Sequence, residues 1–171
     1  MAASQPDPAT FIDCRVGKIV SCKSIEGSSK LYSLEVDMGN DEVKHVVSAA
    51  KKFYSIDDLV DKLVCVFANC QPGELFDEIS EGILLGCATD DNHVELLEPP
   101  MDDQPGDRIY FGSFTDADNE VEEVDPRNKH WNKMLPELRV NRNGEATYKG
   151  ENIYTDYGNV VAPNLTDCPF H

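Results

Sequence analysis

Residues 31–38 read LYSLEVDM, and apolar and polar side chains alternate along the whole stretch. Tyr32, Leu34, Val36 and Met38 fall on one face of an extended chain, and the residues between them fall on the other. Because successive side chains of a strand point to opposite faces of a sheet, this pattern predicts a half-buried β-strand. The Gly-Asn-Asp sequence that follows predicts a turn into a second strand over residues 43–48, and so a β-hairpin.

Further strand-like segments flank this hairpin. We predict strands over residues 11–20, 63–68, 82–88 and 94–97, with a bulge or bend at Gly17 in the first of them. Ser55 and Asp58 fit the two positions of a capping box and predict a short helical turn. About five strands separated by turns favour a small barrel or a sandwich. We prefer the barrel because closure leaves no exposed edge strand.

The C-terminal part of the chain predicts a different, smaller unit. Residues 99–107 are an acidic, Pro-rich connector, after which β-structure restarts. Asp125 and Pro126 suit the start of one helix, and Pro136 is expected to end it. The fold class predicted is therefore all-β dominated. Its expected parts are a flexible leader (1–8), a barrel (9–107) and a smaller β-rich lobe with one helix (108–171).

The charge balance limits the kinds of partner. Fifteen Lys and Arg against 32 Asp and Glu give a net charge of −17. Since Lys and Arg contacts to phosphate supply most non-specific affinity for nucleic acid, any RNA-binding surface has to be a local basic patch. Apolar runs fall short of the ~20 residues of a membrane span, and the N-terminus lacks the features of a secretory signal. We expect a soluble cytoplasmic protein without a membrane partner.

Sequence motifs of catalysis and metal binding are absent. The six cysteines show no C-x-x-C spacing, and the four histidines show no pairing at i, i+4. Several cysteines lie in apolar runs, which is typical of buried free thiols. No nucleophile elbow, P-loop or dinucleotide-binding motif occurs. We therefore expect no catalytic residue, no metal and no cofactor.

Basic side chains gather at three places along the sequence. These are Lys18, Lys23 and Lys30, then Lys51 and Lys52, and finally Lys129 and Lys133 on the predicted helix. Lys51 and Lys52 precede Phe53 and Tyr54, a combination that suits contact with a backbone and stacking on bases. The alternatives are that Phe53 and Tyr54 belong to the core and that the helix lysines only increase solubility.

A set of motifs spread over most of the chain points to a family. They are DCRVGKI at 13–19, KLYSLEVDMG at 30–39, VVSA at 46–49, FANCQP at 67–72, SEGILL at 80–85 and PGDRI at 105–109. Together they resemble the tRNA-binding domain family, which includes endothelial monocyte-activating polypeptide II and C-terminal extensions of tyrosyl- and methionyl-tRNA synthetases. DPRNKHW at 125–131 and ATYKG at 146–150 resemble the C-terminal half found in the polypeptide II subgroup.

This resemblance implies an OB-fold, a five-stranded Greek-key barrel, with the lobe covering the surface that simpler members use to dimerise. A monomer is the expected state. The resemblance also implies a non-catalytic module that binds tRNA by shape and backbone, without anticodon specificity. It would be associated with, or be the C-terminal domain of, an aminoacyl-tRNA synthetase or a multisynthetase complex.

The resemblance also implies a set of contact residues. Ser48, Asn69 and Ser80 match positions of the family's binding surface, and Arg15, Lys18 and Lys30 match its basic positions. With the other basic residues, the RNA-binding set is Arg15, Lys18, Lys23, Lys30, Ser48, Lys51, Lys52, Asn69, Ser80, Lys129 and Lys133.

Three residues depart from the family pattern. Gln71, Glu74 and Asp77 stand where relatives carry basic residues. Since carboxylates repel phosphates, these departures favour an alternative function, a protein–protein assembly module of the same fold with weakened RNA binding. A cytokine-like role is a further alternative that rests on the resemblance alone.

Overall fold

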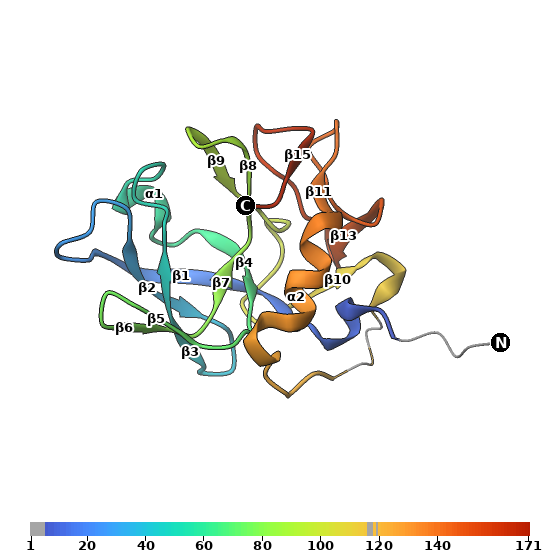
Figure 1. The fold of residues 1–171 in the computed structure, drawn as a ribbon, viewed down its shortest axis with the longest axis horizontal. Helices are drawn as coiled ribbons and strands as arrows, with labels where there is room; N and C mark the ends of the chain where they lie inside the picture. The colour runs from blue at the N-terminus through green and yellow to red at the C-terminus, as the bar shows by residue number, and fades with distance from the viewer. Residues whose placement is uncertain (1–5, 116–117, 119) are drawn as a thin grey trace.

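The computed structural model describes residues 6–115, 118 and 120–171, and β-structure dominates. A barrel occupies one side of the molecule and the C-terminal lobe the other (Figure 1). The strands of the barrel half are β1 Cys14–Ser24, β2 Tyr32–Asp37, β3 Val43–Ser48, β4 Leu63–Phe67, β5 Gly73–Leu75, β6 Glu78–Ser80, β7 Ile83–Leu84, β8 Gly86–Asp90 and β9 His93–Leu96. Those of the lobe are β10 Arg108–Phe111, β11 Leu138–Val140, β12 Ala146–Tyr148, β13 Glu151–Thr155, β14 Gly158–Asn159 and β15 Cys168–Pro169. The helices are α1 Ile56–Leu59 and α2 Lys129–Met134, with 3-10 turns η1 Pro8–Phe11, η2 Gly112–Phe114, η3 Pro126–Asn128 and η4 Leu135–Glu137.

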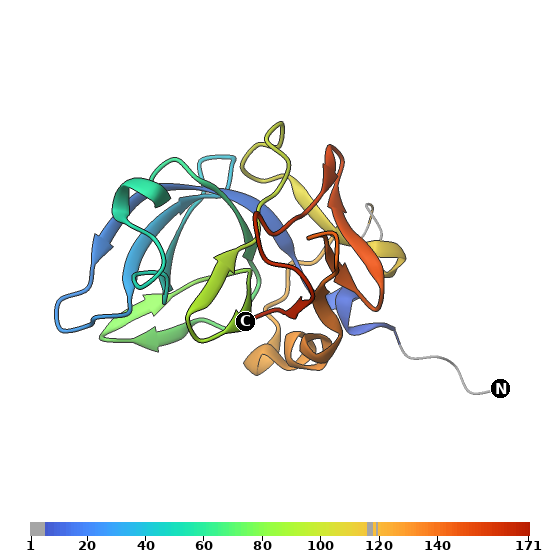
Figure 2. The ribbon, with the colours of Figure 1, turned by 90° about the horizontal axis from the view of Figure 1, so that it is seen from above.

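Five strands form the barrel in the order β3-β2-β1-β4-β7, and each adjacent pair is antiparallel. β3 packs against β7 and brings the two ends of this series together. α1 lies between β3 and β4 in the chain. The curvature of the strands is clear from above (Figure 2). This arrangement confirms the predicted OB-type barrel.

The lobe continues the sheet of the barrel. β10 pairs with the start of β1, where Cys14 lies opposite Ile109, and the sheet then runs through β13, β12, β11 and β15. One apolar core contains residues of both parts, and the rings of Phe67 in β4 and Trp131 in α2 lie 4.9 Å apart. A second core fills the barrel alone. The lobe therefore begins with β10 at Arg108, but it shares an apolar core with the barrel.

Several local predictions are confirmed. Tyr32, Leu34 and Val36 are buried while the residues between them are partly exposed, as the alternation predicts. Ser55 and Asp58 form both hydrogen bonds of the capping box. These two features depend on neighbouring residues only, which is why they can be read from the sequence.

Other local predictions need correction. The expected strand over residues 82–88 is divided at Leu85 into β7 and β8, and the hairpin β5–β6 has no counterpart in the predicted elements. The bulge of β1 lies between Ile19 and Ser21, not at Gly17. Gly17 instead packs tightly, because a Cβ atom there would lie 2.6 Å from Val36 Cγ1.

The predicted leader also differs in part. Residues 1–5 lie outside the described residues, but Asp7 is held by the fold. Its carboxylate accepts hydrogen bonds from Tyr148 Oη at 2.7 Å, Lys149 Nζ at 2.6 Å and Ala9 N at 2.9 Å. In the described part of the chain, no helix has the length and apolar character needed to span a membrane.

Replacing Gly17 with Ala is expected to lower the free energy of unfolding by about 1–3 kcal/mol, because the added methyl group overpacks the barrel core. Gly73→Ala is the matched control, since a Cβ atom at Gly73 meets nothing within 4 Å. The control should change stability by less than about 0.5 kcal/mol. Denaturation followed by the fluorescence of Trp131, the single tryptophan, measures both. Equal effects of the two substitutions would contradict the packing role of Gly17.

Candidate nucleic-acid interface

Three lysines gather where two loops of the barrel lie side by side. The β1–β2 loop contacts the segment after β3, since Lys51 N donates to Lys30 O at 3.3 Å and Lys51 Nζ donates to Ser28 O at 3.1 Å. Lys30 and Lys52 are exposed. Among the described residues, no carboxylate forms an ion pair with Lys30, Lys51 or Lys52. We call these three residues the loop-end lysines.

The two aromatic residues next to the loop-end lysines have different roles. Tyr54 belongs to the fold, because its hydroxyl accepts a hydrogen bond from Leu96 N at 3.0 Å and its carbonyl accepts one from Tyr32 Oη at 2.8 Å. Phe53 is half-buried, and Lys52 Nζ lies 5.7 Å from the centre of its ring. Tyr54 is half-buried as well, with Lys62 Nζ 5.9 Å from its ring centre, but its hydrogen bonds tie it to the fold, whereas the Phe53 side chain forms none within the described residues.

The predicted cations of β1 face carboxylates. Arg15 Nε pairs with Asp13 at 2.9 Å, and its guanidinium also donates to Gly106 O. Lys18 lies opposite Asp37 in the β1–β2 ladder. A hydrogen bond from Ser33, with smaller effects of His45 and Lys23, holds the pKa of Glu78 below its ordinary value. Arg15 is thus paired with a carboxylate, while Lys18 and Lys23 each have one acidic residue nearby, Asp37 and Glu78.

Lys129 and Lys133 form a second basic area on α2. Both are exposed and line a cavity of about 590 Å³ with Phe11 and Phe114. α2 packs against η1, on the lobe side of the molecule, and lies away from the β1–β2 loop (Figure 1). The structure therefore does not bring the helix lysines together with the loop-end lysines.

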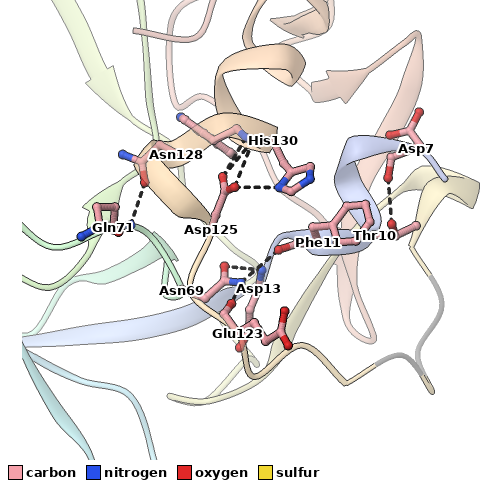
Figure 3. A network of polar contacts seen from close by, with 11 residues as sticks. Asp7, Thr10, Phe11, Asp13, Asn69, Gln71, Glu123, Asp125, Asn128 and His130 are labelled. Atoms are coloured by element: carbon pink, nitrogen blue, oxygen red, sulfur yellow. Dashed lines mark hydrogen bonds and ion pairs between the residues drawn. The ribbon is translucent and has the colours of Figure 1, made fainter. Parts of the chain in front are cut away.

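Asn69 is buried and links three segments (Figure 3). Its Oδ1 accepts a hydrogen bond from Asp13 N at 2.8 Å, and its Nδ2 donates to Phe11 O at 3.0 Å and Glu123 O at 2.8 Å. These bonds fix the start of β1 and the segment that leads to α2. Asn69 therefore holds these segments of the surface in place. Its direct contact with RNA stays a prediction.

Asp125 fixes the start of α2 in the same network (Figure 3). Its carboxylate accepts hydrogen bonds from His130 N and Trp131 N, and pairs with His130 Nδ1 at 2.7 Å. The predicted N-cap position needs correction, because the α-helix starts at Lys129 with Asn128 as its cap residue, and Asp125 reaches the first turn of α2 from outside the helix. Asp125 orients the turn that carries Lys129.

The two predicted serines differ in access. Ser80 is buried, accepts a hydrogen bond from Val47 N at 3.0 Å and donates one to Gly82 O at 2.9 Å. Ser48 is half-buried and lines a cavity of about 380 Å³ next to Phe53. Ser80 thus joins the β6–β7 segment to β3, and its contact with RNA stays a prediction, as does that of Ser48.

His45 is a polar centre that the sequence analysis missed. Its ring nitrogens pair with Glu35 and Glu78, each at 2.8 Å, and its backbone N donates to Glu81 Oε1. Partial burial acts against the charged ring, but the hydrogen bonds to Glu35 and Glu78 prevail and raise the pKa of His45. Because side chains alternate along each strand, the sequence could place His45 and Glu35 on the same face of the β2–β3 hairpin. The sequence could not show that Glu78 lies next to His45, because that contact forms only when the fold brings β6 against β3.

The cysteines are buried and free, as predicted. Burial raises the pKa of Cys70 to about 11, so that its thiol stays protonated at neutral pH. In the described residues, no group of three or more His, Cys, Asp or Glu side chains is arranged to hold a metal ion.

The family model for the putative tRNA binding domain matches residues 14–108, which contain the whole barrel. The chain belongs to this family. The match covers both the loop-end lysines and the segment with Asn69 and Ser80.

Individual relatives support the same assignment. The chain is 32% identical to the cytoplasmic methionine–tRNA ligase of Arabidopsis thaliana over 92% of its own length and 20% of the ligase. It is 33% identical to the aminoacyl tRNA synthase complex-interacting multifunctional protein 1 of Mus musculus, over 86% of this chain and 46% of that protein. The chain thus spans less than half the length of these relatives.

A solved structure shows that the likeness extends into the lobe. The C-terminal domain of Plasmodium vivax p43 superposes with a TM-score of 0.85 and covers 95% of this chain and 98% of that one. At 24% sequence identity, this likeness shows the fold, barrel and lobe together.

Replacing Asn69 with Ala is expected to lower the free energy of unfolding by at least about 2 kcal/mol, because buried backbone groups of three segments lose their partner. Asn132→Ala, an exposed change on α2, is the matched control and should alter stability by less than about 0.5 kcal/mol. Denaturant unfolding measures both. A stable Asn69→Ala variant that loses only RNA affinity would show instead that Asn69 contacts RNA directly.

The His45 cluster predicts a dependence of stability on pH. The raised pKa of His45 means that its contribution is complete below the ordinary histidine pKa of about 6.5 and is lost as pH rises through the folded-state pKa. In His45→Gln, stability should therefore fall relative to the unmodified chain more at about pH 5.5 than at about pH 8.5. Denaturant titrations at both pH values test this. An equal loss at both would exclude a contribution from the imidazolium.

Proposed function

We propose that this chain is a non-catalytic tRNA-binding module that recognises the shape and backbone of tRNA without anticodon specificity. The single observation that carries the proposal is the match of residues 14–108 to the putative tRNA binding domain family. The loop-end lysines support it, because their charge is not neutralised by an ion pair within the described chain. Cations without a carboxylate partner are available to phosphate.

The backbone of tRNA would contact the loop-end lysines first. Lys30, Lys51 and Lys52 come from two loops that are in contact, so they present their charges on one part of the surface, and the partly exposed ring of Phe53 offers a stacking surface. Arg15, Lys18 and Lys23 would contribute less, because acidic side chains lie next to them. Lys129 and Lys133 would form a second contact area for another part of the same folded RNA.

The module would act by keeping tRNA near an aminoacyl-tRNA synthetase, as part of that enzyme or as a component of a multisynthetase complex. Its own contribution would be a raised local concentration of tRNA. The names of the relatives, cytoplasmic ligases and a complex-interacting protein, support this setting and a cytoplasmic location. We further propose that the chain is monomeric, because the lobe covers the barrel surface through which a second copy would otherwise bind.

Charge reversal of Lys51 and Lys52 is expected to weaken tRNA binding and its dependence on salt. Because each phosphate contact adds about 0.7–0.9 to the slope of log K against log salt, Lys51→Glu/Lys52→Glu should reduce the slope by about 1.4–1.8. Filter binding or fluorescence anisotropy over a salt series measures this slope.

Arg139→Glu/Arg142→Glu is the matched control, since it makes the same change in net charge at two exposed positions of the lobe. The control should leave the slope nearly unchanged. If both double variants weaken binding equally, the loop-end lysines are not the contact. If tRNA fails to bind the unmodified chain even at low salt, the proposed function is wrong.

A further inference from the structure

A groove with apolar walls opens beside the hairpin β5–β6. It is the cavity of about 380 Å³ that Ser48 lines. Phe53, Ile83, Leu84 and Leu96 contribute its apolar lining, and Leu75 of β5 forms part of one side. The hairpin that borders it is unusually apolar for a surface element, since Leu75, Phe76 and Ile79 are 45%, 55% and 60% exposed. Exposed apolar side chains around a concave surface are typical of interaction sites.

β5 leaves one backbone edge available next to this groove. In the described part of the chain, β6 is the only strand that pairs with β5. Residues 73–75, which make up β5, are all exposed and all line the groove. The space beside Gly73 is open, since a Cβ atom added there would meet no other atom within 4 Å. An extended peptide could therefore add to this edge and hydrogen-bond to it, as peptides do at other free strand edges.

The charges at this edge favour a basic occupant. Glu74 lines the groove, Asp77 lies at the exposed turn of the hairpin, and Glu81 is exposed just after β6. Lys52, whose Nζ donates a hydrogen bond to Asn92 Oδ1 at 2.9 Å, does not line the groove. A phosphate backbone along β5 would meet Glu74 and Asp77 and be repelled, whereas Lys or Arg side chains would be attracted.

We infer that the groove between β5 and Phe53 binds an extended, basic segment of a protein partner. The segment adds as a strand to β5, places alternate apolar side chains into the groove, and directs Lys or Arg toward Glu74 and Asp77. The groove contains none of the loop-end lysines, although Ser48 and Phe53, which line it, also belong to the proposed tRNA contacts. It goes beyond the proposed tRNA binding and does not depend on it.

A labelled octapeptide of alternating Lys and Val, blocked at both ends, is the probe, with the alternating Glu and Val peptide as its charge control. Fluorescence anisotropy with the full chain at about 0.15 M salt, where long-range attraction is largely screened, measures binding. The Lys-Val peptide should bind at least about tenfold more tightly than the Glu-Val peptide. N-methylation of alternate residues of the Lys-Val peptide should abolish binding, because it removes the hydrogen bonds to β5.

Variants of exposed residues separate the groove from general attraction to an acidic protein. Glu74→Lys/Asp77→Lys should reverse the preference between the two peptides, whereas Glu122→Lys/Glu123→Lys, an equal charge change on the lobe side, should alter binding by less than about threefold. Leu75→Ser should weaken the Lys-Val peptide, and Met101→Ser, at a side chain 91% exposed, should not.

Three results would overturn the inference. Equal effects of the two charge-reversal variants would mean unspecific attraction, and unchanged binding of the N-methylated peptide would exclude strand addition. Loss of tRNA binding in Leu75→Ser, with the peptide still bound, would assign the groove to RNA. Since the tRNA proposal is tested at Lys51 and Lys52, either proposal can fail while the other stands.

Discussion

Strand β1 forms hydrogen-bonded ladders with three strands, β2, β4 and β10, and the positions of the other elements follow from this arrangement. Its first residue, Cys14, lies opposite both Phe67 of β4 and Ile109 of β10. The barrel and the lobe are therefore joined through backbone hydrogen bonds as well as through the shared core at Trp131. Because α2 packs in this core, the lysines on its outer face are held at a fixed place relative to the barrel.

The excess of carboxylates determines which cations remain available. On the outer face of the sheet, acidic residues stand beside the basic ones, as Asp13 does beside Arg15. In the loops at the end of the barrel, backbone and amide oxygens hold Lys51 and Lys52 instead, and their charges persist. A strongly acidic protein can thus keep a local site for phosphate without an overall positive charge.

The fold could be predicted in large part from the sequence because its signals are local. The alternation around Leu34 and the capping box at Ser55 depend on residues a few positions apart, and the structure has both. The contacts of Asn69 and Ser80 depend on segments more than thirty residues away, so the family resemblance could select these residues as candidates, but the sequence could not show that they are buried. Hairpin β5–β6 escaped prediction because each of its strands has only three residues, which is too short for a period-two pattern to be recognised.

The attachment of hairpin β5–β6 has a consequence for motion. Its strands form their own two-stranded sheet, and the contacts of Glu78 with Ser33 and His45, together with the Ser80 hydroxyl, connect it to the barrel. These contacts and the backbone hydrogen bond from Glu81 N to His45 O can break without disturbing the ladders around β1, so the hairpin can open by itself while the barrel stays folded. Its amide hydrogens would then exchange with solvent through local fluctuations, and those of β1 only through global unfolding.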